Sequence, residues 1–157
     1  MSLLERCLVC ACGVDNSVFS DGKQALAAGD GGAVEAARGW RFVKSINLDK
    51  ALSKRFPNDS RWDYGLELKD PRGRVQIDWI EVHPASSSEV ETMIKKKQWL
   101  VALLSRAKSC PLPESHNLHW LATRGVQIDA QRRRRLAAAG LRMPTKSLRL
   151  PISNDRD

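Results

Sequence analysis

The sequence lacks any run of about 20 apolar residues, the length that an α-helix needs to cross a bilayer. Its most apolar N-terminal stretch, Cys7 to Cys12, is too short for a signal peptide and has the charged Glu5 in its flank. We therefore expect a cytoplasmic protein with no membrane partner.

The sequence also lacks a complete zinc motif. Cys7, Cys10 and Cys12 lie close together, but the fourth cysteine, Cys110, is distant and no second close pair exists. A zinc site would require the first three to converge with Cys110 or a histidine as fourth ligand. We expect no zinc, and instead free thiols in a reducing cytosol.

The glycine-rich stretch Gly29 to Gly32 is not a phosphate-binding loop, because it lacks the preceding strand and the following Lys-Ser/Thr. Residues 1–39 are predicted to be a poorly defined N-terminal extension. A chain of 157 residues is long enough for one domain. We place that domain at residues 40–150, with a tail at 151–157.

Acidic residues are outnumbered by basic ones, and the net charge of +8 favours a polyanionic partner. Arg132, Arg133, Arg134 and Arg135 open a helix that is predicted to run to Ala139. These arginines are candidates for binding nucleic acid, most simply DNA, through its phosphates. Lys96 and Lys97 would be a second phosphate-binding group. The alternative is a solvated helix end or a flexible basic tail.

The clearest chemical signal is an acidic hairpin with the sequence RWDYGLELKDPRGRVQIDWIEVHPA, residues 61–85. One strand contributes Asp63, and the other contributes Glu81 and His83. Side chains two apart on a strand share a face, so Glu81 and His83 project together.

The turn of this hairpin decides whether Asp63 joins them. Asp70, Pro71 and Gly73 fit a type I turn whose glycine adopts the left-handed conformation of a bulge. With the bulge Asp63 faces Glu81, and without it Asp63 faces Ile80; we predict the bulged register. The opposite, apolar face would then hold Trp62, Tyr64, Leu66, Leu68, Ile80 and Val82.

Asp63 and Glu81 as cross-strand neighbours would have Cβ atoms roughly 5 Å apart. Like charges at that distance are unfavourable unless a cation lies between them or one carboxyl is protonated. Two carboxylates make a site for Mg²⁺ or Mn²⁺, which could activate water for phosphodiester hydrolysis. The alternative is an inert pair of carboxylates neutralised by Arg61 or by lysines.

After the hairpin, helical spacing of apolar residues predicts a helix from Glu89 to Lys108. A capping box, Ser86 with Glu89 or Ser88 with Glu91, would start it. Alternation then predicts a strand from His116 to Thr123. Trp79 is expected to pack in the core under the helix rather than to stack on a base. The fold class is therefore α/β, a small mixed sheet with a hairpin, a following helix and a further strand.

This order of strand, strand, helix and strand, with Asp63 and the triplet Glu81-Val82-His83, resembles the PD-(D/E)XK nuclease superfamily. The resemblance covers roughly residues 40–128 and implies a restriction-endonuclease-like fold. It implies that Asp63, Glu81 and the backbone carbonyl of Val82 bind a divalent metal. It also implies that a lysine two residues after the glutamate positions or activates the attacking water.

The chain departs from that pattern because His83 stands at the lysine position. A neutral imidazole could bind metal or act as a base near pH 7. Alternatively, Lys95 could reach back from the helix. The first hypothesis is a metal-dependent DNA nuclease with Asp63, Glu81, and His83 or Lys95 as catalytic residues. The second is a catalytically inactive nuclease-fold module that binds nucleic acid or a protein.

Overall fold

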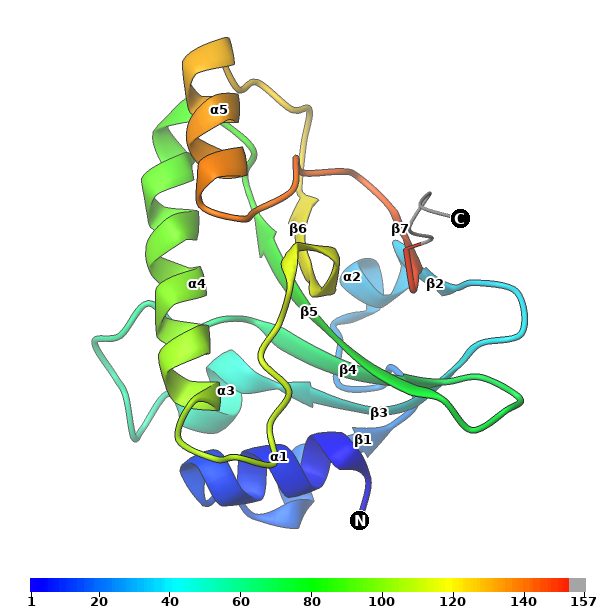
Figure 1. Ribbon diagram of the computed structural model, residues 1–157. Coiled ribbons are helices and arrows are strands. Elements are labelled where there is room, and N and C mark those ends of the chain that lie inside the picture. Colours follow the sequence, from blue (N-terminus) through cyan, green and yellow to red (C-terminus); the bar gives the residue numbers. More distant parts are fainter. Residues whose placement is uncertain (153–157) are drawn as a thin grey trace.

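The protein is built on a five-stranded mixed sheet, and the computed structural model describes residues 1–152 (Figure 1). The strands are β1 (Phe19–Asp21), β3 (Arg41–Asn47), β4 (Tyr64–Lys69), β5 (Val75–His83) and β6 (Leu118–Ala122). They lie in the order β1-β3-β4-β5-β6, and all neighbours are antiparallel except β5 and β6, which are parallel. The expected mixed α/β architecture is confirmed.

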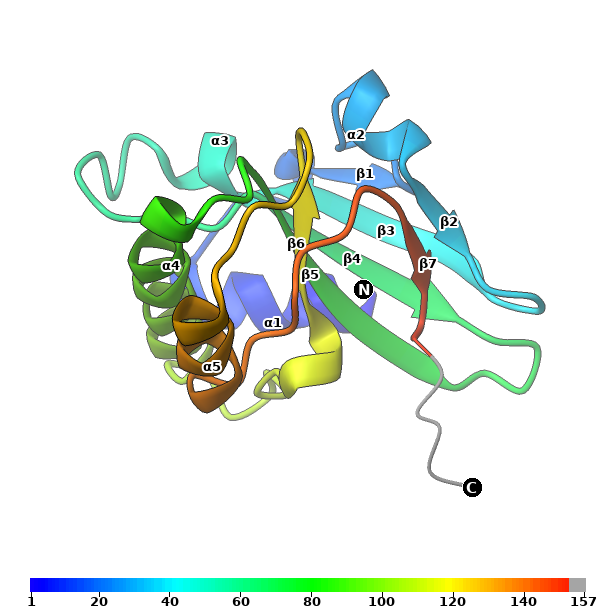
Figure 2. The ribbon, with the colours of Figure 1, turned by 90° about the horizontal axis from the view of Figure 1, so that it is seen from above.

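In the described part of the chain, five α-helices and a second, two-stranded sheet pack around this five-stranded sheet. The helices are α1 (Leu3–Cys12), α2 (Ala28–Gly32), α3 (Leu48–Leu52), α4 (Val90–Leu104) and α5 (Ala130–Ala138). The second sheet pairs β2 (Val34–Ala36) in parallel with β7 (Leu148–Leu150). In Figure 2, α4 and α5 lie on the left and β2 and β7 on the right. No helix within residues 1–152 is both long enough and apolar enough to cross a membrane.

The hairpin of β4 and β5 has the predicted register. Gly73 adopts a φ of 82°, and its amide donates to the carbonyl of Asp70 at 3.0 Å. Tyr64 pairs with Ile80, as the bulged register requires. The turn therefore brings Asp63, just before β4, opposite Glu81.

The two faces of the sheet bury separate cores. One face packs Ile77 and Trp79 against α1 and α4, so the core position predicted for Trp79 is confirmed. The other face packs Leu66 and Ile80 against residues of β2 and β7. Trp62 was expected on this second face but is buried in the first core. It precedes β4 and has no strand conformation, so strand alternation does not apply to it.

The first 39 residues, for which the sequence predicts a poorly defined extension, are built into the fold. Leu4 and Leu8 of α1 are fully buried, and the amide of Leu4 donates to Glu67 of β4 at 2.8 Å. β1 extends the main sheet and β2 pairs with β7. The predicted tail at 151–157 falls mostly outside the described residues, which end at residue 152.

A disulfide joins Cys7 of α1 to Cys110, which follows α4, so the expectation of four free thiols is wrong. Cys10 and Cys12 are free; Cys10 is exposed and Cys12 is buried. Burial raises the pKa of the Cys12 thiol. Because Cys7 and Cys110 are bonded to each other, the alternative of a zinc site built on them is also wrong.

The helix after the hairpin, α4, is shorter than expected and starts differently. It begins at Val90 after a 3₁₀ turn, Ser87–Glu89, and neither start has a side-chain cap, so the predicted capping box is absent. The carboxylate of Glu89 instead binds His83. The basic helix α5 begins at Ala130, where Asp129 caps it by accepting from the amide of Arg132 at 2.9 Å.

Candidate active site

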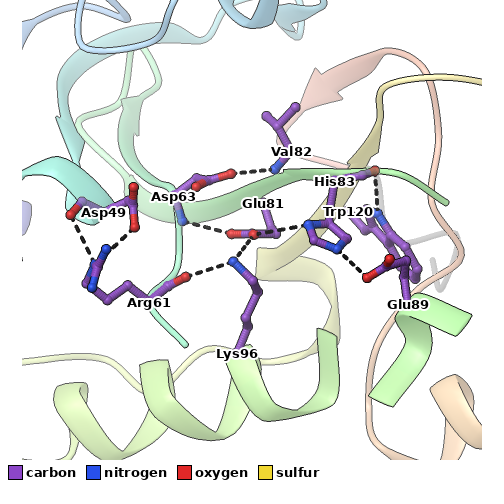
Figure 3. Close-up of polar contacts among 9 residues, drawn as sticks. All are labelled: Asp49, Arg61, Asp63, Glu81, Val82, His83, Glu89, Lys96 and Trp120. Atoms are coloured by element: carbon purple, nitrogen blue, oxygen red, sulfur yellow. Dashed lines mark hydrogen bonds and ion pairs between the residues drawn. The ribbon is translucent and has the colours of Figure 1, made fainter. Parts of the chain in front are cut away.

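Asp63 and Glu81 meet where β4 begins and β5 approaches its end (Figure 3). The backbone amide of Asp63 donates to Glu81 Oε2 at 2.9 Å. The backbone amide of Val82 donates to Asp63 Oδ2, also at 2.9 Å. Each carboxylate is thus held by the backbone of the opposing segment, which fixes both side chains.

Burial and like charge act together on this pair. Glu81 is 1% exposed, and this burial raises its pKa; the nearby charge of Asp63 raises it further, to about 8. Burial also raises the pKa of Asp63, although the amide of Val82 opposes the rise. The ion pair with Lys96 favours the ionised form of Glu81, but desolvation outweighs it. Two adjacent carboxyls with raised pKa values favour either a shared proton or a cation between them.

A lysine from α4 already supplies one positive charge to Glu81. Lys96 Nζ lies 2.5 Å from Glu81 Oε1 and donates to the carbonyl of Arg61 at 3.0 Å. Lys95, the residue expected to reach back from the helix, is exposed instead. The lysine that the structure brings to the acidic pair is therefore Lys96.

Helix geometry explains this difference. Residues three and four apart share a helix face, which puts Lys96 on the same side as the buried Met93 and Leu100. Lys95 lies on the opposite, solvent side. The spacing of apolar residues thus excludes Lys95, but it does not distinguish Lys96 from Lys97, which lies four residues after Met93 and three before Leu100.

His83 lies beside the pair but is oriented by another acid. Its Nε2 is 2.6 Å from Glu89 Oε2, whereas its Nδ1 is 4.0 Å from Glu81 Oε1. Its backbone carbonyl accepts from Trp120 Nε1 at 3.0 Å. The interaction of Glu89 with His83 was missed because the sequence assigned Glu89 to a helix cap.

The chemistry of these groups decides what they could hold. Within residues 1–152 no group of three or more His, Cys, Asp or Glu side chains could hold a metal ion. Asp63 and Glu81 nevertheless offer the oxygen ligands that Mg²⁺ and Mn²⁺ prefer. The ammonium of Lys96 forms an ion pair with Glu81, so a positive charge at this site is stabilised. A divalent ion bound by the two carboxylates would compete with Lys96 for Glu81.

Of the residues predicted to bind phosphate, the two lysines have internal partners and the four arginines are exposed. Lys97 is tied to the carbonyl of Ala139, and Lys96 to Glu81, so neither ammonium is free for a phosphate in this arrangement. Arg132 to Arg135 are all exposed on α5.

The chain matches no protein-family model, no curated protein and no solved structure.

Proposed function

We propose that this protein is a metal-dependent phosphodiester hydrolase that acts on nucleic acid, most simply DNA. The observation that carries the proposal is the meeting of Asp63 and Glu81, each held by a backbone amide of the opposite segment. Placing the buried carboxylate of Glu81 beside the half-buried carboxylate of Asp63 is costly unless a positive charge compensates it, and a divalent cation can compensate both at once.

The order of elements supports the same proposal. Strands β3, β4 and β5 are consecutive and antiparallel, α4 crosses over, and β6 returns parallel to β5. This is the arrangement that the resemblance to the restriction-endonuclease-like fold leads us to expect. Glu81 lies on β5, where the resemblance leads us to expect it, and Asp63 lies one residue before β4 rather than within a strand.

Each residue then has a role. Asp63 and Glu81 would hold Mg²⁺ or Mn²⁺, with the carbonyl of Val82 as the further ligand that the resemblance implies. The ion would lower the pKa of a bound water and neutralise charge on a phosphate oxygen. Lys96 would supply the positive charge that, in the nuclease superfamily, comes from a lysine at the position of His83. His83, oriented by Glu89, is placed to accept a proton next to Glu81.

Cleavage of labelled single- and double-stranded DNA with Mg²⁺ or Mn²⁺ tests the proposal. We expect cutting by the wild type and a loss of at least about 100-fold in the D63N/E81Q variant, because metal catalysis contributes several kcal/mol. The matched control is D21N/E35Q, which neutralises two exposed acids, 81% and 67% accessible, away from the site. Equal cutting by D63N/E81Q and the control would refute the proposal.

A second function is favoured by the contact between Lys96 and Glu81. An internal ammonium that neutralises Glu81 is also what a module without a metal would need. In that case the protein binds nucleic acid or a protein through its positive charge and cuts nothing. Absence of cutting by the wild type under every metal condition, with salt-sensitive DNA binding retained, would select this alternative.

A further inference from the structure

A basic groove lies between the start of α4 and the helix α5. Its volume is about 620 Å³. Its lining includes Ser87, Ser88, Glu91, Arg132, Arg134 and Arg135. Three arginines face one glutamate in this space, so the groove has a net positive charge.

The contacts of the four consecutive arginines separate them into two classes. Arg133 does not line the groove, and its Nε donates to the carbonyl of Ile128 at 3.0 Å. Arg135 is paired with Glu91 across the groove, Nε to Oε1 at 2.9 Å. These two arginines hold α5 in place.

The other two arginines remain available for an anion. The side chain of Arg134 makes no hydrogen bond or ion pair with any residue in the described part of the chain. Arg132 makes only long side-chain contacts of 3.4 Å, to Asp129 and Gln131, and its side chain is 49% exposed. Two guanidinium groups without strong internal partners therefore face the same groove.

The groove is close along the chain to a residue that contacts the acidic site. Ser87 and Ser88, which line it, immediately precede Glu89, and Glu89 binds His83 next to Glu81. A polyanion bound to Arg132 and Arg134 would thus lie beside the segment that leads to Glu89 and His83. A nucleic-acid strand has this repeating phosphate charge.

We infer that this groove is a phosphate subsite for the backbone of a DNA strand, with Arg132 and Arg134 as the contacting residues. The identity of the ligand rests on the proposed function, since the strand is the one that the acidic site would cut. Arg133, Arg135, Lys96 and Lys97 do not contact the phosphates. Only half of the arginine run is therefore used for binding.

Equilibrium binding of a labelled DNA duplex, measured by fluorescence anisotropy in EDTA over a series of salt concentrations, tests this subsite. We expect R132Q/R134Q to bind about 10- to 100-fold more weakly at 0.1 M salt. The slope of log K against log salt should become shallower by about 1.8, because two phosphate contacts are lost. The full-length protein is used, and near-identical circular dichroism would verify that both variants are folded.

The matched control is R38Q/R72Q, which removes the same charge from exposed arginines at the turn end of the hairpin, away from the acidic site. We expect this control to keep most of the wild-type slope. An equal change in both variants would mean a diffuse charge effect and would overturn the subsite. An unchanged slope in R132Q/R134Q would overturn it as well.

The same assay separates this inference from the proposed hydrolase activity. Because EDTA prevents metal-dependent cutting, a selective loss in R132Q/R134Q supports the groove even if the protein never cleaves DNA. Conversely, metal-dependent cutting with normal DNA binding by R132Q/R134Q would leave the hydrolase intact and remove the groove.

Discussion

Replacing Glu81 by glutamine should change how the stability of the protein depends on pH. Burial and the charge of Asp63 raise the pKa of Glu81 from 4.5 to about 8 in the folded protein. Between these values the folded state binds a proton that the unfolded state has lost. The free energy of unfolding therefore falls as the pH rises through this window.

The size of the effect follows from the pKa shift. One pKa unit corresponds to about 1.36 kcal/mol, so a rise from 4.5 to about 8 sets an upper limit of about 5 kcal/mol. The slope cannot exceed about 1.4 kcal/mol per pH unit for one proton. Glutamine has the shape of the protonated acid and does not titrate. The E81Q variant should thus match the wild type near pH 5 and be more stable near pH 8.

Urea unfolding followed by tryptophan fluorescence, from about pH 5 to 8.5 in EDTA with the disulfide intact, measures this difference. The relevant quantity is the free energy of unfolding of E81Q minus that of the wild type at each pH, because it cancels the other titrating groups. E35Q is the control, since Glu35 is 67% exposed. A difference that does not grow with pH would refute the assignment of a raised pKa to Glu81.

Three further changes test other parts of the account by the same unfolding measurement. K96M should destabilise the protein more at pH 8 than at pH 5, because it removes the positive charge from ionised Glu81, whereas K95M should have little effect. C7S/C110S should lose up to about 4.7 kcal/mol, the loop entropy of a disulfide that spans 103 residues, and should no longer respond to reducing agents. G65A should cost about 1–3 kcal/mol because its Cβ would lie 2.7 Å from the ring of Trp79, while G125A meets open space and should be neutral. If K96M or G65A is as stable as its control, the ion pair of Lys96 or the close contact of Gly65 with Trp79 is contradicted. If C7S/C110S is as stable as the oxidised wild type, the stabilising role of the disulfide is contradicted.

The sequence predicts the hairpin well because its determinants are local. The turn residues Asp70 and Gly73 set the register within a few positions, and the register alone places Asp63 opposite Glu81. The helix and the strand that follow are encoded by apolar spacing over short windows. The existence of these elements is therefore readable without tertiary information, although their ends differ by several residues.

The features that the sequence did not predict depend on contacts between distant segments. The pairing of β1 with β3 and of β2 with β7 is decided by partners far along the chain, so residues 1–39 looked unstructured. The disulfide joins cysteines that are 103 residues apart, and sequence alone cannot select this pair. The contact between Glu89 and His83 depends on the tertiary structure, so local spacing predicted only a helix cap for Glu89.

We propose that Asp63 and Glu81 hold a metal that cuts a phosphodiester bond. The most direct test of this proposal is the ratio of the Mn²⁺-dependent DNA cleavage rates of the wild type and D63N/E81Q. We expect cutting by the wild type and a ratio of at least about 100, with D21N/E35Q like the wild type. A ratio near one, or no cutting by the wild type, would contradict it.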